Sequence, residues 1–373
     1  MTSISWRSPS LASHCQTHLS AALAEALLSH PSLVSSIKDA SYVFLDAETA
    51  NERGWTPYLD KLDQSVNTVN TEPGQKHETL AWSKGTFSSC YLTHSLNDDV
   101  IHFLREHLPL SKNQTLVLFD YRSSPSVRPI SDDSLIVAGV SLSESAGTFR
   151  PGLDIAVPPP PLRELSHLFS PSCSAASLPL LATLDCVDTH AVRQRLASAA
   201  LGEPDIHVSI KCREWYDGTP GNEAPPPGLC EHDIADVADD AGDKDDWMKR
   251  LSRSVFGYVP RGHGLFTYRL AEVMSAGAIP VVISDGWELP FSEIVDWKTI
   301  SIQVGEEEVE GVVERLRGVG WEERCEMRRR GREFYDRYMR TPGGIVDGVV
   351  QILEEREAAV RCTDALACSD VHN

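Results

Sequence analysis

Residues 255–297, VFGYVPRGHGLFTYRLAEVMSAGAIPVVISDGWELPFSEIVDW, set the fold of the second half of this chain. Apolar run length and periodicity predict three elements here, namely strands at 255–259 and 279–283 and a helix at 265–277. A strand, a crossover helix and a second strand form a right-handed unit whose strands are parallel. The loops at residues 260–264 and 284–288 therefore meet at one sheet edge, where open α/β sheets bind their ligands.

The same alternation of short apolar runs and helical patterns continues through the rest of the chain. Further strands are predicted at residues 41–48, 115–119, 153–157, 178–184 and 205–210, and further helices at 98–108 and 188–201. Asp188 or Thr189 would cap the second of these helices. This alternation favours an α/β fold with parallel sheets covered by helices.

The length of 373 residues suggests two domains. Pro158–Pro161 cannot continue a sheet, and the Pro- and Ser-rich stretch up to Pro179 indicates a linker. We therefore expect an N-terminal domain at residues 1–165, a C-terminal domain at residues 166–361 and a tail at residues 362–373.

The composition excludes some classes of partner. Lys and Arg number 34 and Asp and Glu number 54, so the formal net charge is −20. Such a surface repels nucleic acid and anionic membranes. No apolar run approaches the roughly 18 residues that would span a bilayer, and the N-terminus does not have the pattern of a signal peptide.

The sequence predicts no metal site. It has no CxxC pair, and the acidic run at residues 231–246 lacks the ligand spacing of a calcium loop. Cys212 and Cys230 flank a Pro- and Gly-rich loop. They are either joined by a disulfide or two unrelated thiols.

The loop from Pro260 to Gly264 is the first candidate binding element. It precedes a predicted helix, whose N-terminus favours an anion, and Gly262 lets the backbone approach a ligand. Arg261 adds a positive charge with a bidentate fork. A diphosphate fits this chemistry, although the loop lacks the spacing of a Walker A motif.

Charged and aromatic side chains close to this loop complete the candidate site. Arg269 and Glu272 share a helix face, either as a mutual ion pair or as ligands of a phosphate and of ribose hydroxyls. Asp285, Trp287 and Glu288 follow the second strand and would face a sugar. Trp287 alone could equally be a packing residue, and Glu288 a helix-start residue beside Pro290.

The stretch from Val255 to Trp297 resembles the signature of the exostosin family, the inverting glycosyltransferases of family 47. The matching segments are Pro260-Arg261-Gly262, Arg269, Glu272, Ile279-Pro280-Val281, Ser284 to Glu293 and Trp297. A second match is FRPGLDIAVPPP at residues 149–160, and the pair Cys212 and Cys230 is similar to a cysteine pair of animal members. The likeness is greatest to the N-terminal domain of heparan sulfate co-polymerases.

The resemblance implies a GT-B architecture, in which two Rossmann-like domains enclose an active-site cleft. The N-terminal domain would face a glycan acceptor, and the C-terminal domain would bind a UDP-sugar, with glucuronic acid a candidate sugar. The donor-binding residues would be Arg261, Gly262, Arg269, Glu272, Asp285, Trp287 and Glu288. No metal or other cofactor is expected beyond the donor. The catalytic base is not identified; Asp120, at the end of a predicted strand, is a weak candidate with a structural role as its alternative.

The resemblance also implies a Golgi lumenal protein with a Cys212–Cys230 disulfide, which could form oligomers with itself or with a related glycosyltransferase. Some positions depart from the family pattern: Phe266-Thr267 replaces Gly-Ser, residues 122–127 differ from the acceptor-side loop, and a first strand and membrane anchor are not recognised. These departures favour an alternative, a catalytically inactive paralogue that stabilises a partner. A nucleotide-sugar-binding module outside the secretory route is a third hypothesis.

Overall fold

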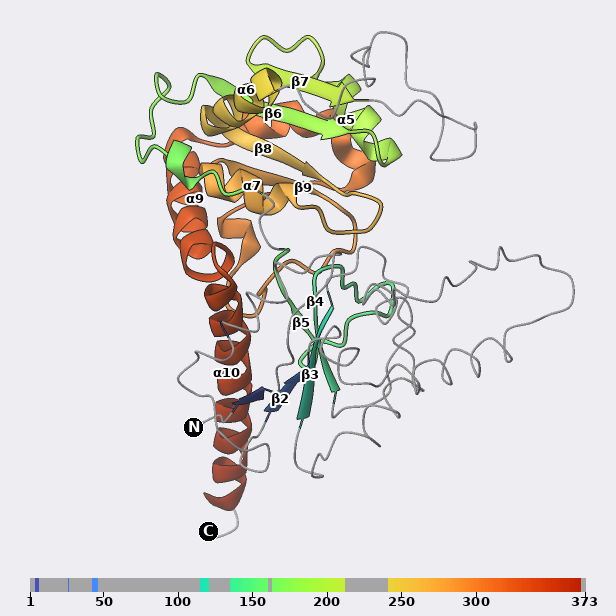
Figure 1. Cartoon of the computed structure of the whole chain (residues 1–373), viewed down its shortest axis with the longest axis vertical. Helices are drawn as coiled ribbons and strands as arrows, with labels where there is room; N and C mark the ends of the chain where they lie inside the picture. The colour runs from blue at the N-terminus through green and yellow to red at the C-terminus, as the bar shows by residue number, and fades with distance from the viewer. Residues whose placement is uncertain are drawn as a thin grey trace, which may run out of the picture.

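The computed structural model of the chain describes residues 4–6, 26, 42–45, 115–120, 135–159, 163–211 and 241–369. Within these ranges the strands form two five-stranded sheets, and every strand pairing is parallel (Figure 1). The predicted α/β class with two Rossmann-like domains, the GT-B architecture, is confirmed.

The first sheet has its strands in chain order. They are β1 (Ile4–Trp6), β2 (Tyr42–Leu45), β3 (Thr115–Asp120), β4 (Leu135–Gly139) and β5 (Ile155–Ala156). β1 precedes the strand with which we expected the sheet to begin, so the expectation of a missing first strand is wrong. The sequence analysis also missed β4, a fully buried strand. The helix predicted at residues 98–108 lies outside the described residues.

The second sheet has the order β10-β9-β8-β6-β7. Its strands are β6 (Leu180–Val187), β7 (Ile206–Lys211), β8 (Ser254–Pro260), β9 (Ile279–Ile283) and β10 (Ile302–Gln303). Because β6 pairs with both β7 and β8, the chain reverses its direction of winding between β6 and β8. This is the topological switch point of a doubly wound sheet.

Helices cover both faces of the second sheet (Figure 1). α5 (Ala191–Ala200) and α8 (Val312–Gly318) share one apolar cluster with β6, and α6 (Ala241–Ser252) and α7 (Arg269–Ala276) belong to another. α5 is capped by His190, not by Asp188 or Thr189 as predicted. α7 begins four residues later than predicted and ends at Gly277, whose φ of 78° is left-handed as a glycine cap allows.

The chain then returns to the first sheet. Short turns η5 (Trp297–Thr299) and η6 (Glu306–Gly311) precede α8, and α9 (Trp321–Phe334), η7 (Tyr335–Met339) and α10 (Pro342–Ser369) follow it. α10 runs beside the first sheet in Figure 1. Arg356 of α10 donates to the carbonyl oxygens of Leu153 and Asp154 at 2.6 and 2.8 Å. Residues 362–369 continue α10, so the predicted tail begins inside a helix, and the predicted domain boundaries remain predictions.

A motif in the first sheet explains one part of the sequence resemblance. Within FRPGLD, Arg150 makes an ion pair of 2.6 Å with Asp154 and donates to the Leu135 carbonyl oxygen at 2.6 Å. Asp154 is buried and also accepts from the Val137 backbone N–H at 2.9 Å. The motif therefore ties the segment before β5 to β4 and has a structural role.

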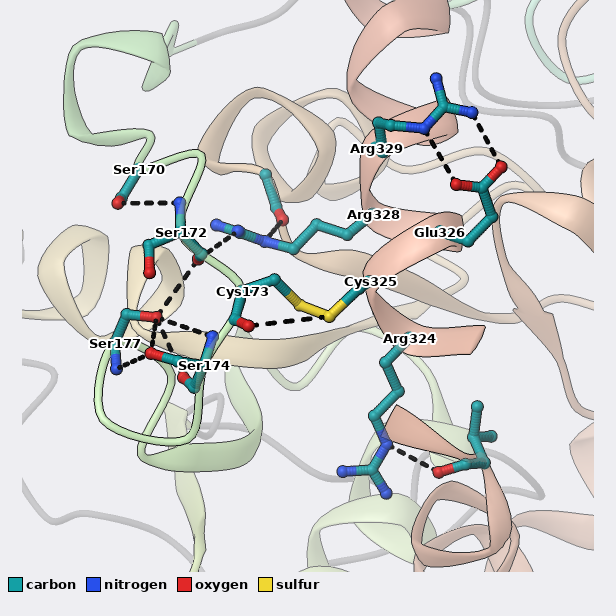
Figure 2. Close-up of a disulfide and its surroundings, with 12 residues drawn as sticks. Ser170, Ser172, Cys173, Ser174, Ser177, Arg324, Cys325, Glu326, Arg328 and Arg329 are labelled. Carbon is teal, nitrogen blue, oxygen red and sulfur yellow. Dashed lines mark hydrogen bonds and ion pairs between the residues drawn. A yellow bond between two sulfur atoms is a disulfide. The ribbon is translucent and has the colours of Figure 1, made fainter. Parts of the chain in front are cut away.

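A disulfide fixes the linker to the second domain. Cys173 in the linker is joined to Cys325 of α9, with Cα atoms 5.8 Å apart (Figure 2). Beside it, Arg328 donates to the Ser172 carbonyl oxygen at 3.0 Å and to the Gly277 carbonyl oxygen at 2.6 Å. The sequence analysis did not find this pair. Cys212 and Cys230 lie outside the described residues, so their disulfide remains a prediction.

The loops that follow β4 and β9 hold the two sheets together. The Trp287 indole donates to the Val140 carbonyl oxygen at 2.9 Å, and the Glu288 N–H donates to the Leu142 carbonyl oxygen at 2.9 Å. These residues follow the C-terminal ends of their strands, so those ends of the two sheets face one another.

Candidate functional site

The strands on either side of the switch point separate at their C-terminal ends. The last registered pair between β6 and β8 is Thr183 with Gly257, although β6 continues to Val187 and β8 to Pro260. The carbonyl groups beyond this pair need other donors, because buried backbone groups are almost always hydrogen-bonded. The separated ends form the crevice in which doubly wound sheets bind ligands.

Two guanidinium groups supply those donors. Arg269, the first residue of α7, donates to the Asp185 carbonyl oxygen at 2.6 Å. Arg193 of α5 donates to three carbonyl oxygens, those of Val187, Pro260 and Arg261, at 2.8, 3.2 and 2.7 Å. Two positive charges therefore lie between the ends of β6 and β8.

Arg261 lies at the other side of the crevice, where the loop after β8 meets the end of β9. Its N–H donates to the Ile283 carbonyl oxygen at 2.9 Å, and its Nη1 lies 3.4 Å from Oε1 of Glu306. The same Glu306 oxygen accepts from the Asp285 N–H at 3.0 Å, and the Glu306 N–H donates back to Asp285 Oδ1 at 3.1 Å. Loops 260–264 and 284–288 thus meet as predicted, and Glu306 joins them.

Arg269 and Glu272 form the mutual ion pair that the sequence analysis left as one alternative. Arg269 Nη1 lies 3.1 Å from Glu272 Oε2, and its guanidinium stacks 4.4 Å from the ring centroid of Trp247. Glu272 is only 4% exposed. Burial raises the pKa of its carboxyl group above the ordinary value, and the Arg269 charge opposes that shift. Contacts of either residue with a ligand remain a prediction.

Trp287 and Glu288 have different surroundings. Trp287 is buried in the apolar cluster between the sheets and donates to Val140, which is a packing role. Glu288 accepts from the Ser292 hydroxyl at 2.7 Å. It lines a groove of about 670 Å³ together with residues of the segment between β9 and β10 and Gln303. Trp287 also lines this groove but is only 7% exposed, whereas Glu288 is partly exposed and more accessible to a ligand.

The loop between β8 and α7 does not place a bulky ring in the crevice. Phe266 is buried in the apolar cluster and packs edge-to-face on Tyr268, with ring centroids 5.2 Å apart. Gly262 lies against Arg193: a Cβ added to the glycine would be 3.9 Å from Nη2. The Phe266 carbonyl oxygen would be 3.4 Å from the same Cβ. Phe266 therefore adds core packing with its ring, and only its backbone lies beside Gly262.

Arg193 and Glu306 are the site residues that the sequence analysis missed. Arg193 binds backbone carbonyl oxygens, and Glu306 binds the Asp285 N–H and the Arg261 guanidinium. These partners are distant in sequence, and no local pattern marks the two residues. Asp120, the candidate base, is the last residue of β3 and pairs with Gly139; its role remains a prediction. Within the described ranges, no group of three or more His, Cys, Asp or Glu residues is arranged to hold a metal ion, and no helix there is long and apolar enough to cross a membrane.

Comparison with known proteins decides the family. The Exostosin GT47 domain matches residues 118–319, more than half of the chain. The chain belongs to the exostosin GT47 family. The matched residues include the ends of β6 and β8 and the loops that Glu306 joins, so the site described above lies within the exostosin domain.

Two curated exostosins illustrate the extent of the similarity. The Exostosin-1 homolog of Caenorhabditis elegans is 38% identical over 117 residues, which are 31% of this chain and 31% of that protein. Exostosin-2 of Mus musculus is 25% identical over 335 residues, 87% of this chain and 40% of that protein. The chain thus spans less than half the length of these relatives.

A comparison of structures gives similarity at low sequence identity. WaaG, described as a glycosyltransferase involved in lipopolysaccharide biosynthesis, aligns with a TM-score of 0.37 and 9% identity, covering 80% of this chain and 95% of that one.

Proposed function

We propose that this exostosin chain is an inverting glycosyltransferase that transfers a sugar from a UDP-sugar to a glycan acceptor, with glucuronic acid the first sugar to test. The observation that carries the proposal is the crevice between the ends of β6 and β8, which holds two guanidinium groups and borders Arg261. A departing diphosphate needs positive charge around it, and preorganised cations stabilise such a charge most effectively. Membership of the exostosin GT47 family supports the same reaction class.

The diphosphate and the ribose would bind at the crevice. Arg261 and Arg269 bind the diphosphate, and Gly262 leaves room for it beside the backbone. Glu272 accepts hydrogen bonds from the ribose hydroxyls. In the free protein, Arg269 and Glu272 neutralise each other, so binding would exchange part of this ion pair for contacts with the ligand.

The sugar would bind on the side of the loop after β9. Glu288 contacts the transferred sugar. Asp285 acts through Glu306, which it holds at hydrogen-bonding distance and which in turn orients Arg261. Trp287 contributes by fixing this loop to the first sheet.

The reaction needs no metal ion in this proposal. An acceptor hydroxyl oxygen attacks the anomeric carbon while the bond from that carbon to the UDP oxygen breaks. The bonding electrons leave with UDP, whose charge the arginines neutralise. The hydroxyl proton passes to a general base. Asp120 is the candidate base because β3 ends in the acceptor-side sheet.

Release of UDP tests the activity directly. The purified chain is incubated with a panel of UDP-sugars, with and without glycan acceptors, and free UDP is measured. We expect release that depends on one donor sugar and increases with an acceptor. Release that is equal for every sugar, or absent throughout, would contradict the proposal.

Calorimetry with UDP tests the assigned residues. Arg261→Ala removes a charge-assisted contact with the diphosphate and should weaken UDP binding by roughly ten- to hundredfold. Glu288→Gln should leave UDP binding unchanged and weaken binding of the intact UDP-sugar. Arg195→Ala is the matched control, because Arg195 is an exposed arginine whose ion pairs join it to Glu307 and Glu310. If Arg261→Ala binds UDP as tightly as this control, the diphosphate assignment is wrong.

The compartment and partners belong to the same proposal. The Cys173–Cys325 disulfide supports folding in an oxidising compartment, and the Golgi lumen is the expected site. The chain would form oligomers with itself or with a related glycosyltransferase.

The alternative is a non-catalytic exostosin that stabilises a partner. It is favoured by the two ion pairs, Arg261–Glu306 and Arg269–Glu272, which already neutralise the cations of the crevice. This alternative predicts no UDP binding at millimolar concentration, so the same calorimetry separates the two hypotheses.

A further inference from the structure

Arg193 is the most constrained polar side chain of the crevice. It belongs to α5, yet its three donating nitrogens reach carbonyl oxygens at the end of β6 and in the loop after β8. The residue is 8% exposed. One guanidinium group therefore fixes the end of β6 and the start of the loop after β8 relative to each other.

The charge of Arg193 has no carboxylate ion pair among the described residues. Burial lowers the pKa of its guanidinium group, and the Arg269 charge lowers it further, while Cys186 and Asp188 oppose the shift. Arg195, two residues along α5, differs in each respect: it is more exposed and lies 3.0 and 3.2 Å from the carboxylates of Glu310 and Glu307. Arg193 is therefore a buried cation whose charge is met by three carbonyl oxygens and by the charge of Asp188, without a direct ion pair. An anion bound in the crevice would add to this compensation.

We propose that Arg193 is a positioning residue for the donor diphosphate: it fixes the backbone of Pro260 and Arg261 at the crevice and adds a buried positive charge beside Gly262. This inference rests on the proposed function, because it assigns a further residue to the same ligand. Arg193 acts on the anion through the loop that it holds and through its charge. It is therefore expected to affect binding of the phosphates and not of the nucleoside.

Two substitutions separate charge from packing. Arg193→Gln removes the charge and keeps a hydrogen-bond donor, and Arg193→Lys keeps the charge with fewer donors. Arg195→Gln is the matched control on the same helix. Calorimetry on each protein uses three probes: UDP, uridine and inorganic diphosphate.

We expect Arg193→Gln to weaken UDP and inorganic diphosphate by at least about tenfold, as for a lost charge-assisted contact. Uridine binding should be unchanged, and Arg193→Lys should restore most of the lost affinity. Arg195→Gln should match the wild type with all three probes. If Arg193→Gln does not fold, Arg193→Lys decides through the smaller loss that remains: it should bind UDP measurably more weakly than the wild type and uridine equally well.

Equal UDP affinity in wild type and Arg193→Gln, or equal weakening of UDP and uridine, would overturn the inference and leave Arg193 a structural residue. If the wild type binds inorganic diphosphate but not UDP, the proposed donor is wrong. Arg193 would then still position an anion, but not one that belongs to a UDP-sugar. A wild-type protein that binds neither probe would overturn both.

Discussion

At the residue scale, the segment between β9 and β10 contains two left-handed backbone conformations. Gly286 has a φ of 74° and Phe291 a φ of 54°. The second is unusual because Phe291 has a side chain; its N–H donates to the Ala156 carbonyl oxygen at 2.8 Å, and its ring lies against Gly348 of α10. Strain of this kind persists only where the surroundings determine the conformation. Here the surroundings are the contact between the two sheets.

Gly286→Ala should destabilise the protein. Alanine in the left-handed region costs about 1–2 kcal/mol, and the added Cβ would lie 2.6 Å from the Ser145 hydroxyl oxygen of the first sheet's loop. Chemical denaturation measures the loss. The control is Gly320→Ala, where φ is −64° and nothing lies within 4 Å of the added atom. Equal stability of the two variants would show that this loop does not pack as described.

Part of the site could be predicted at this scale. Residues 260–264 and 284–288 were predicted to meet because the rule for strand–helix–strand units fixes which strand ends lie together. Arg193 and Glu306 could not be predicted, because their partners are distant in sequence and only the fold brings them near. Arg193 is separated by 67 and 68 residues from the two carbonyl groups of the β8 loop.

At the element scale, the strands followed from the sequence better than the helix starts did. The predicted strand at residues 279–283 coincides with β9, since an apolar run between Gly277 and Ser284 has clear limits. The helix predicted from Leu265 begins at Arg269, and the Leu265 carbonyl oxygen, which a helix starting there would use, accepts from the Ser284 hydroxyl at 2.8 Å. Tertiary hydrogen bonding of this kind leaves no local pattern.

Loss of the Cys173–Cys325 disulfide should lower stability without changing the sheets. Closing a loop of this length stabilises a protein by about 2–5 kcal/mol, chiefly by restricting the unfolded chain. The double variant Cys173→Ser, Cys325→Ser should therefore unfold at lower denaturant concentration than the oxidised wild type. Reductant is the control: it should destabilise the wild type more than the variant, in which only the predicted Cys212–Cys230 bond is left to reduce. A reductant effect of similar size on both proteins would point to a different disulfide.

At the scale of the whole molecule, α10 belongs to both halves of the fold. It follows the second sheet in sequence and runs beside the first sheet (Figure 1), and its residues Ile345 and Val349 lie in the apolar cluster that includes Val117 and Val259 of the two sheets. The sequence predicted two domains because strand and helix patterns repeat on each side of a linker. It predicted no helix at residues 342–369, so the return of the last helix to the first sheet was not foreseen.

Arg356→Ala should weaken this connection. Arg356 donates to two carbonyl oxygens of the first domain and makes an ion pair of 2.6 Å with Glu293 in the segment after β9. Loss of these charge-assisted bonds should cost about 2–4 kcal/mol, measured by calorimetric unfolding. Arg315→Ala is the control, because Arg315 is exposed and lies 3.8 Å from Glu308; about 0–1 kcal/mol is expected there. Identical melting of the two variants would mean that α10 does not join the domains.

The disulfide makes the second half of the chain a closed covalent ring. Residues 173 to 325 contain all of β6 to β10, and the ring closes where the two Cα atoms are 5.8 Å apart. The polypeptide therefore enters the ring at Cys173 and leaves it at Cys325, two residues that lie side by side. The first domain precedes the entry, and the end of α9 follows the exit. A peptide bond broken anywhere inside the ring leaves one covalent molecule, and its two pieces can separate only after the sulfurs are reduced.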